Sequence, residues 1–339
     1  MINLSTGPVA LNDSVLESFQ EPRISHRSGD FLQSFNQLQL ELCEALHCEQ
    51  VFIFPGSGTL ANEIMLHQIF LAGGPGLILS NGEFGERLIA QAQRHQLVFD
   101  VLQTEWGQSF DIPEVQQQLT QSKASWILFC HCETSTGCVQ PLDDIKELCT
   151  DLNCKVYVDC MSTIGCMEID MTGVHMCTFS SGKGIGSKAG LGIVATNGAV
   201  KTSDQTLVAF DLIHFVRTGG VPTTISSDAV FALREAVHIN LHSARSEEVT
   251  RKKKLVKEQL GEYILNGENC HSVFTIPVMN KNSTELGKRL KQDFGILVSY
   301  ESAYLVKRNW FQLTLFQSHR DSDLSEALSV ISQILKSES

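Results

Sequence analysis

The chain has 339 residues, of which 42% are hydrophobic, and a formal net charge of -12. This length is enough for one large core and a smaller second domain. The acidic balance argues against nucleic-acid binding, because phosphate backbones are bound by clustered Lys and Arg. No uncharged apolar run reaches the roughly 18 residues of a membrane span, and the first residues lack a basic segment followed by an apolar one, so a cytoplasmic protein is expected.

Eleven cysteines is a high number, yet the count is odd and no Cys-x-x-Cys pair occurs. We interpret them as reduced thiols buried as small apolar residues, in preference to metal ligands or disulfides. No metal site is predicted. The one basic run, Arg251–Lys254, is flanked by acidic residues and is typical of a solvated helix face.

Short apolar strands alternate with amphipathic helices through the first two thirds of the chain. The first helix is expected over residues 30–47, where apolar side chains recur at spacings of three and four. Further helices are expected over 60–71, 86–95 and 142–152, and strands over 51–54, 77–80, 98–102, 126–130, 155–159, 176–180 and 191–195. This alternation predicts an α/β fold with a mostly parallel sheet covered by helices on both faces.

Beyond about residue 226 the pattern changes to a long helical stretch over 227–263, broken near Ser243. A compact α+β segment is expected to follow, with strands over 272–278, 296–300 and 310–316 and helices over 283–294 and 322–335. We place the domain boundary near residue 240. The predicted organisation is an N-terminal segment (1–15) that packs near the small domain, a large domain (16–240) and a small C-terminal domain (241–339).

An aspartate ends one predicted strand, and a lysine lies in the turn after the next one. Asp159 closes the apolar run Val156–Asp159, and Lys183 lies in the turn that follows the next apolar run. A pyridoxal phosphate (PLP) enzyme needs this pair, a carboxylate for the pyridinium nitrogen and an amine that forms the Schiff base and moves the proton. Asp159 could equally cap the following turn. Lys188 competes for the second role, but Lys183 is preferred because it directly follows the strand.

Three other stretches carry chemistry. Pro55–Thr59 joins a strand to a helix, and its exposed backbone N–H groups and two hydroxyls suit a phosphate; a plain capping turn is the alternative. It is not a Walker loop, since no Gly-Lys-Ser/Thr follows. Cys130–Gly137 offers hydroxyl groups after a strand, and Phe84 offers an aromatic face to stack on a flat ring, although a lone Phe more often belongs to the core.

Together these stretches resemble the fold-type I, class V PLP-dependent aminotransferases, in particular the alanine–glyoxylate, serine–pyruvate and 2-aminoethylphosphonate–pyruvate branch. The resemblance covers nearly the whole chain. It implies the PLP-transferase fold, with a mostly parallel sheet sandwiched by helices in the large domain and a small α+β C-terminal domain. The matching motifs are Ser5–Pro8, Ile24–Ser28 with Phe31, Gly56–Thr59, Asn81–Arg87, Glu133–Gly137 with Gln140–Leu142, Val158–Asp159 and Ser180–Lys183.

The resemblance also implies roles for individual residues. Asp159 and Lys183 are the expected catalytic pair, and Thr224 matches a position that reaches the phosphate from the neighbouring subunit, so a homodimer with shared active sites is expected. The candidate cofactor-binding residues are Ser57, Gly58, Thr59, Phe84, Thr136, Asp159, Ser181, Lys183 and Thr224, and the candidate substrate-binding residues are His26, Arg27 and Gln312.

The late strand departs from the family pattern. Family members usually carry an arginine there that forks onto the substrate carboxylate, and Gln312 stands about where that arginine is expected. A neutral amide cannot form the bidentate ion pair. Arg308, Arg27 or Arg217 are the alternative carboxylate ligands, or the substrate lacks this carboxylate.

The leading hypothesis is a PLP-dependent aminotransferase that moves an amino group from a small amino donor to a keto or aldehyde acceptor, such as pyruvate or glyoxylate, in two half-reactions. A lyase or desulfurase-like enzyme with the same cofactor is the first alternative. It needs a mobile, exposed cysteine, for which Cys270 is the only late candidate. A non-catalytic PLP-fold binding protein is the second.

Overall fold

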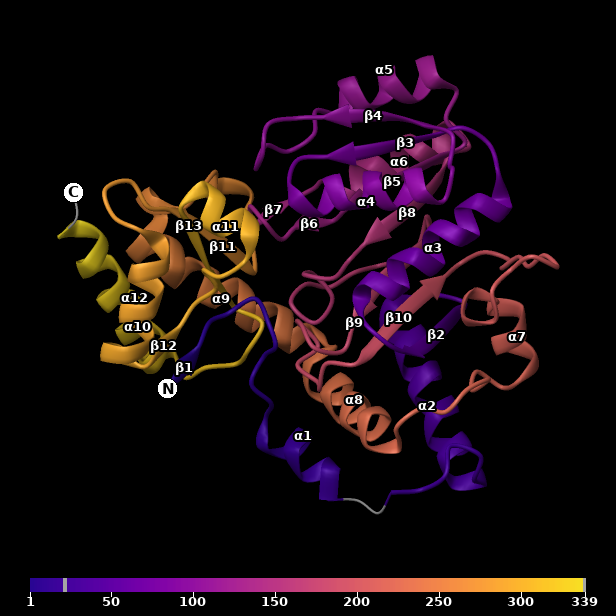
Figure 1. Cartoon of the computed structure of the whole chain (residues 1–339), viewed down its shortest axis with the longest axis horizontal. Coiled ribbons are helices and arrows are strands. Elements are labelled where there is room, and N and C mark those ends of the chain that lie inside the picture. Colours follow the sequence, from indigo (N-terminus) through magenta and orange to yellow (C-terminus); the bar gives the residue numbers. More distant parts are fainter. Residues whose placement is uncertain (21–22, 338–339) are drawn as a thin grey trace.

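The computed structural model describes residues 1–20 and 23–337. Figure 1 shows a larger lobe built around a sheet and a smaller lobe formed by the C-terminal part of the chain, with the N-terminus beside the smaller lobe. Among the described residues, no helix has the length and apolar character needed to cross a membrane.

The large lobe contains a seven-stranded sheet in the order β2-β10-β9-β8-β5-β3-β4. β10 runs antiparallel to both of its neighbours, and the other neighbouring strands are parallel. The predicted α/β class and mostly parallel sheet are therefore confirmed. The strands are β2 (Gln50–Pro55), β3 (Gly76–Ser80), β4 (Phe99–Gln103), β5 (Trp126–Cys130), β8 (Lys155–Asp159), β9 (Val174–Ser180) and β10 (Leu191–Thr196).

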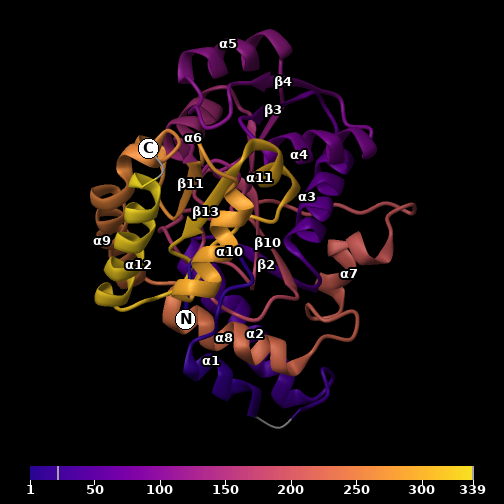
Figure 2. The same cartoon turned by 60° about the vertical axis from the view of Figure 1, so that its left-hand side comes forward.

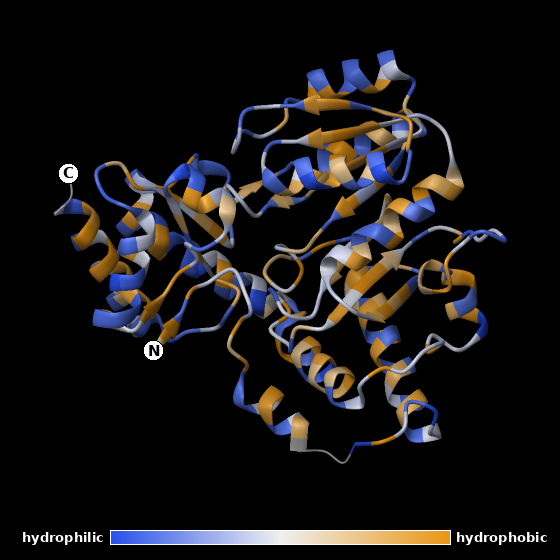
Figure 3. Cartoon of the chain, in the orientation of Figure 1, coloured by the Kyte–Doolittle hydropathy of each residue, from blue (hydrophilic) through white to orange (hydrophobic). Residues whose placement is uncertain are grey.

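Helices cover both faces of this sheet, and alternate strand residues point into two different hydrophobic cores. Ile127 and Phe129 belong to one hydrophobic cluster, whereas Leu128 and Cys130 belong to another. The first cluster also takes side chains from α2 (Gly29–Leu46), α5 (Ile112–Ser122), α6 (Leu142–Asp151) and α8 (Ser227–Asn240); the second takes them from α3 (Gly58–Ala72), α4 (Glu83–Arg94) and α7 (Leu212–Arg217). Figure 3 shows the hydrophobic strands and the more hydrophilic outer helices.

Two helices of the large lobe, α5 and the short α7, were not predicted. α5 buries only Val115 and Leu119, and most of its remaining residues are polar, so its apolar stripe is too narrow to give a clear periodic signal. Its boundaries are nevertheless well marked, since the Asp111 side chain accepts a hydrogen bond from the backbone N–H of Glu114 at the first turn.

The small lobe packs its helices around a short antiparallel pair of strands. The pair is β11 (Val273–Pro277) with β13 (Trp310–Thr314). Figure 2 shows α9 and α12 side by side on this lobe. Its helices are α9 (Ser243–Leu260), α10 (Ser283–Phe294), α11 (Ala303–Arg308) and α12 (Asp321–Lys336), and β12 (Ile296–Leu297) is its remaining strand.

The N-terminal segment lies against this lobe, because β1 (Ile2–Asn3) pairs in parallel with β12. Beyond it, the short helix α1 (Asp13–Glu17) precedes the large lobe. Apart from Leu4, Val9, Cys132 and Cys166, the hydrophobic cluster of the small lobe consists of residues from Val249 onward, whereas the first cluster of the large lobe ends at Val237. The boundary near residue 240 stays a prediction; Asn240 is the last residue of α8, and α9 begins at Ser243.

Candidate active site

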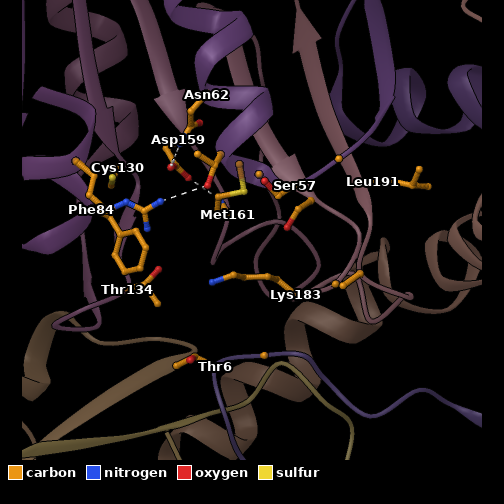
Figure 4. A pocket seen from close by; sticks show the side chains of 18 of the residues that line it. Thr6, Ser57, Asn62, Phe84, Cys130, Thr134, Asp159, Met161, Lys183 and Leu191 are labelled. Atoms are coloured by element: carbon orange, nitrogen blue, oxygen red, sulfur yellow. Dashed lines mark hydrogen bonds between the residues drawn. The ribbon is translucent and has the colours of Figure 1, made fainter. Parts of the chain in front are cut away.

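A cavity of about 420 Å³ opens at the carboxyl ends of the parallel strands. Figure 4 shows side chains from several strand ends pointing into it. Ligands of open α/β sheets bind at this edge, and the volume is within the usual range for small-molecule sites. Its lining includes Thr6, Gly7, Pro8, Ser57, Gly58, Thr59, Asn62, Phe84, Arg87, Cys130, Cys132, Thr134, Asp159, Met161, Ser180, Gly182, Lys183 and Leu191.

Asp159 is the last residue of β8, and protein donors hold both of its oxygens. Asn62 Nδ2 donates to Oδ2 at 2.7 Å, and the backbone N–H of Met161 donates to Oδ1 at 2.9 Å. The Thr178 hydroxyl in turn donates to Asn62 Oδ1. Burial raises the pKa of the Asp159 carboxyl, and these hydrogen bonds and the charge of Lys183 oppose that shift. The carboxylate is therefore fixed in position and supported in its charged form.

Lys183 lies in the loop after β9 and reaches into the same cavity. Its Nζ is 5.8 Å from the Phe84 ring centroid and 6.0 Å from that of Phe316. Burial lowers the pKa of the Lys183 ammonium, and the nearby negative charge of Asp159 opposes this shift. A lowered pKa favours the neutral amine, which is the nucleophilic form. Lys188, the competing lysine, is exposed and lies over the Phe19 ring instead.

The first turn of α3 presents donors to the cavity. Ser57 precedes the helix and makes no capping hydrogen bond to it, and the following residues have backbone N–H groups at the positive end of the helix. A Cβ at position 58 would lie 2.3 Å from Met161 Sδ, so a larger residue there would require the Met161 side chain to move. Arg87 Nη2 donates to Thr59 Oγ1 at 3.2 Å. This set of hydroxyls, N–H groups and a guanidinium suits an anion.

Phe84 is positioned by a buried carboxylate. Glu133 is fully buried and accepts hydrogen bonds from the backbone N–H groups of Phe84 and Gly85, at 3.1 and 2.9 Å, in the first turn of α4. Burial raises the pKa of Glu133, and these bonds together with those from Ser135 oppose the shift. Gly82 is needed beside it, since a Cβ there would lie 2.5 Å from Glu133 Cγ. The start of α4, and with it the Phe84 ring, is thereby fixed at the cavity.

A comparison of the sequence with known protein families agrees with the chemistry of this cavity. Residues 16–302 match the family model described as Aminotransferase class-V. The chain belongs to the class-V aminotransferase family. Members of this family are PLP enzymes, so the predicted family, enzyme class and cofactor are confirmed.

Individual relatives are more distant. This aminotransferase is 26% identical over 290 residues to an uncharacterized aminotransferase of Methanocaldococcus jannaschii, covering 79% of this chain and 74% of that one. It is 32% identical over 148 residues to a 2-aminoethylphosphonate–pyruvate transaminase of Bacillus mycoides, covering 43% and 40%. The fold matches that of a ureidoglycine–glyoxylate aminotransferase from Bacillus subtilis with a TM-score of 0.90 at 21% identity, covering 99% and 93%. The last likeness shows the fold, which is fold type I.

The residues of the cavity fit PLP. The first turn of α3 provides unpaired donors for a phosphate, the carboxylate of Asp159 can face a pyridinium nitrogen, Lys183 offers an amine, and Phe84 offers a ring face. Arg87 and Glu133 lie within motifs matched from the sequence but were given no role there, and Asn62 was not singled out. No local signal in the sequence assigns their roles, because each acts through a partner on a different element of the fold.

Two candidate cofactor ligands do not line the cavity. The Thr136 hydroxyl donates to the Glu133 carbonyl at 3.4 Å, and Thr134, two residues earlier, lines the cavity in its place. The Ser181 hydroxyl donates to the Lys188 carbonyl and accepts the N–H of Leu191, so it closes the loop that carries Lys183. Both side chains are used in holding loops together.

The candidate substrate ligands and Thr224 also lie outside the cavity lining of this single chain. Gln312 is fully buried; its Nε2 donates to the Thr275 hydroxyl at 2.7 Å, and its Oε1 accepts from the Tyr304 hydroxyl at 2.8 Å. Its amide is therefore satisfied by protein groups. His26, Arg27 and Thr224 are on loops, with Arg27 and Thr224 exposed.

The contact between Asn62 and Asp159 gives a first prediction. Asn62→Leu removes a hydrogen bond that lowers the pKa of Asp159, so this pKa rises. When the pH is lowered, the charged form of Asp159 is then lost at a higher pH than in the unaltered protein. The acid limb of PLP affinity against pH is expected to shift to higher pH, with a smaller shift in Thr178→Val. Equilibrium binding of PLP measured across pH checks this.

Gln68→Leu is the matched control, because Gln68 lies on the same helix and makes two hydrogen bonds to the backbone of Lys201, away from Asp159. Its pH profile is expected to match that of the unaltered protein. If Asn62→Leu also leaves the profile in place, Asn62 has no positioning role toward Asp159.

Proposed function

We propose that this class-V aminotransferase moves an amino group from a small amino donor to a keto or aldehyde acceptor, such as pyruvate or glyoxylate, in two half-reactions. The observation that carries the proposal is the meeting of Asp159 and Lys183 in one cavity, from the ends of the adjacent strands β8 and β9. Phe84 and the first turn of α3 complete a site of suitable size and chemistry.

Each side chain has a proposed task. When bound, PLP supplies an electron-withdrawing ring that stabilises negative charge on the substrate carbon. Ser57, Gly58 and Thr59 hold the phosphate with hydroxyls and backbone N–H groups, and Asp159 keeps the ring nitrogen protonated. Lys183 Nζ takes a proton from the substrate carbon and returns it, which its lowered pKa favours.

The groups available to bind a substrate acid differ from those expected. Arg308 stacks 3.5 Å from the Trp106 ring centroid, and neither it nor Arg27 or Arg217 lines the cavity. Lys183 and Arg87 are the lysine and arginine side chains found among the described lining residues, and Arg87 is engaged with Thr59. We therefore include donors without an α-carboxylate; the name of the Bacillus mycoides relative also specifies an aminophosphonate donor.

Dimer formation is part of the proposal. Thr224 is exposed on the loop before α8 and does not line the cavity of its own chain. We propose that it completes the phosphate site of a second copy of the chain, as the family resemblance implies. His26 and Arg27 stay candidate substrate ligands on another loop.

The desulfurase alternative finds less support. Cys270 is buried, with 1% of its surface exposed, and its thiol lies 3.7 Å from the Leu265 carbonyl. Burial raises the pKa of this thiol to about 12. It is therefore not the exposed, nucleophilic cysteine that such an enzyme needs.

Transfer of labelled nitrogen distinguishes the two functions. The PLP-loaded enzyme is incubated with ¹⁵N-labelled donors, including carboxylate-free amines, and with pyruvate or glyoxylate, and the products are identified by mass spectrometry. The proposal predicts the label in an amino acid formed from the acceptor. Release of labelled ammonia or of sulfur, with no labelled amino acid, would instead identify a lyase or desulfurase.

A further inference from the structure

The C-terminus of α2 brings two cysteines together. The backbone N–H of Cys48 donates to the Cys43 carbonyl at 3.0 Å, and that of His47 donates to the Glu44 carbonyl at 3.3 Å. His47 has a left-handed conformation, with φ of 53°. These are the paired bonds of a Schellman motif, which brings the side chains of Cys43 and Cys48 into contact.

The same motif ends other helices of the large lobe. After α6, the N–H of Cys154 donates to the Cys149 carbonyl at 2.8 Å, so these two cysteines occupy the equivalent positions. After α5, the equivalent pair is Leu119 and Ala124, joined by a bond of 3.2 Å. The motif therefore needs only apolar side chains at these positions, and its backbone does not explain why α2 carries two thiols.

Exposure separates the pair at the end of α2 from all the other thiols. The chain's eleven cysteines all lie within the described residues, and only Cys43 and Cys48 are partly exposed; the other nine are buried. Cys149 and Cys154 form a matched pair with the same backbone but little access to solvent, at 1% and 8% exposure.

The thiols of Cys43 and Cys48 also influence each other. Hydrogen bonding to Cys48 is the largest cause that lowers the pKa of Cys43, and the same interaction raises the pKa of Cys48. Cys43 is therefore the thiol that ionises, and Cys48 is the neutral thiol beside it. A thiolate next to a second thiol is the arrangement in which oxidation ends in a disulfide.

We propose that Cys43 and Cys48 form a reversible oxidation site that reacts with hydrogen peroxide. The Cys43 thiolate attacks one peroxide oxygen, the O–O bond breaks, and water leaves after protonation, which gives a sulfenic acid. The sulfur of Cys48 then displaces the hydroxyl group as a second water, and the S–S bond forms. The peroxide is reduced by two electrons, and the two thiols are oxidised to one disulfide.

This site is separate from the cavity. Cys48 precedes β2, whereas the cavity lies beyond the other end of that strand, at Gly56 and Ser57. The cavity thiols Cys130 and Cys132 are buried, and burial raises the pKa of both. Oxidation is therefore expected at α2 while the cavity thiols stay reduced.

Peptide mapping tests the proposal. The full chain, loaded with PLP, is treated with hydrogen peroxide, alkylated, digested without reduction and analysed by mass spectrometry. The expected result is loss of both alkylatable thiols at Cys43 and Cys48, their recovery as one linked pair, and its reversal by a dithiol reductant. Cys149 and Cys154 are expected to stay thiols under the same treatment.

The variant Cys48→Ser sharpens the test. It removes the resolving thiol, so a dimedone adduct is expected to accumulate at Cys43, whereas Cys149→Ser is expected to leave the linked pair unchanged. If Cys43 and Cys48 remain separately alkylated, or if Cys149 and Cys154 link first, the proposal is wrong.

Discussion

Lys183→Ala is expected to lower the rate of nitrogen transfer by at least about 10²- to 10⁴-fold, which is the usual contribution of a single general acid–base group. The loss follows from the position of Nζ in the cavity with Asp159 and close to Phe84. The loop is expected to keep its shape, because Ser181 holds it through the Lys188 carbonyl and the Leu191 N–H. The absorbance of lysine-linked PLP near the visible edge should be lost as well.

Lys188→Ala is the matched control for this variant. Lys188 lies on the same loop but is exposed and rests on Phe19, so both the absorbance and the rate are expected to stay unchanged. Retention of the absorbance in Lys183→Ala, or its loss in Lys188→Ala, would reverse the assignment of the two lysines.

Asp159→Asn is expected to slow the reaction by about 10²-fold, comparable to the loss of one preorganised electrostatic partner at a reacting centre. The change removes the negative charge proposed to face the ring nitrogen. It also removes a charge that raises the pKa of Lys183, so this pKa falls further. More of the neutral amine is then present at low pH, and the acid limb of the rate of PLP incorporation is expected to shift to lower pH.

Stopped-flow absorbance across pH measures this incorporation rate, and single-turnover nitrogen transfer measures the slower reaction. Asp170→Asn serves as control, since this aspartate is exposed and its neighbours are Thr172, His47 and Lys146 rather than cavity residues. A profile of Asp159→Asn that moves to higher pH, or full activity at all pH values, contradicts the role given to Asp159.

The sequence predicted the fold and the strand-end residues because both depend on local patterns. Each predicted strand of the sheet is present, and the carboxyl ends of parallel strands meet at one edge, so Asp159 and Lys183 had to come together once the sheet formed. The same reasoning predicted that the Ser57 turn and Phe84 lie at that edge.

Contacts that depend on how the elements pack were not predictable in this way. Asn62 meets Asp159 across 97 positions of sequence, because α3 packs on β9 and β10. Glu133 reaches the first turn of α4 only through the strand order of the sheet. The sequence analysis selected Thr136, whereas Thr134 lines the cavity. The local turn decides which of these two hydroxyls faces the cavity, and the sequence pattern does not show that turn.

Gln312 illustrates the same limit in the small lobe. The sequence indicated the absence of an arginine, but the partner that occupies its amide oxygen is Tyr304, on the short helix α11, which was not predicted. A helix of six residues has too few turns to give a periodic signal. In the structure, protein groups satisfy the amide of Gln312. The nitrogen-transfer experiment tests what the missing arginine means for the substrate.

We propose that Lys183 is the residue that holds PLP. Reduction of the PLP-loaded protein with borohydride, followed by digestion and peptide mapping by mass spectrometry, tests it most directly, because it identifies the modified lysine without a known substrate. The phosphopyridoxyl group is expected on Lys183 and not on Lys188. Modification of Lys188, or no stable modification of Lys183 in the loaded protein, would contradict it.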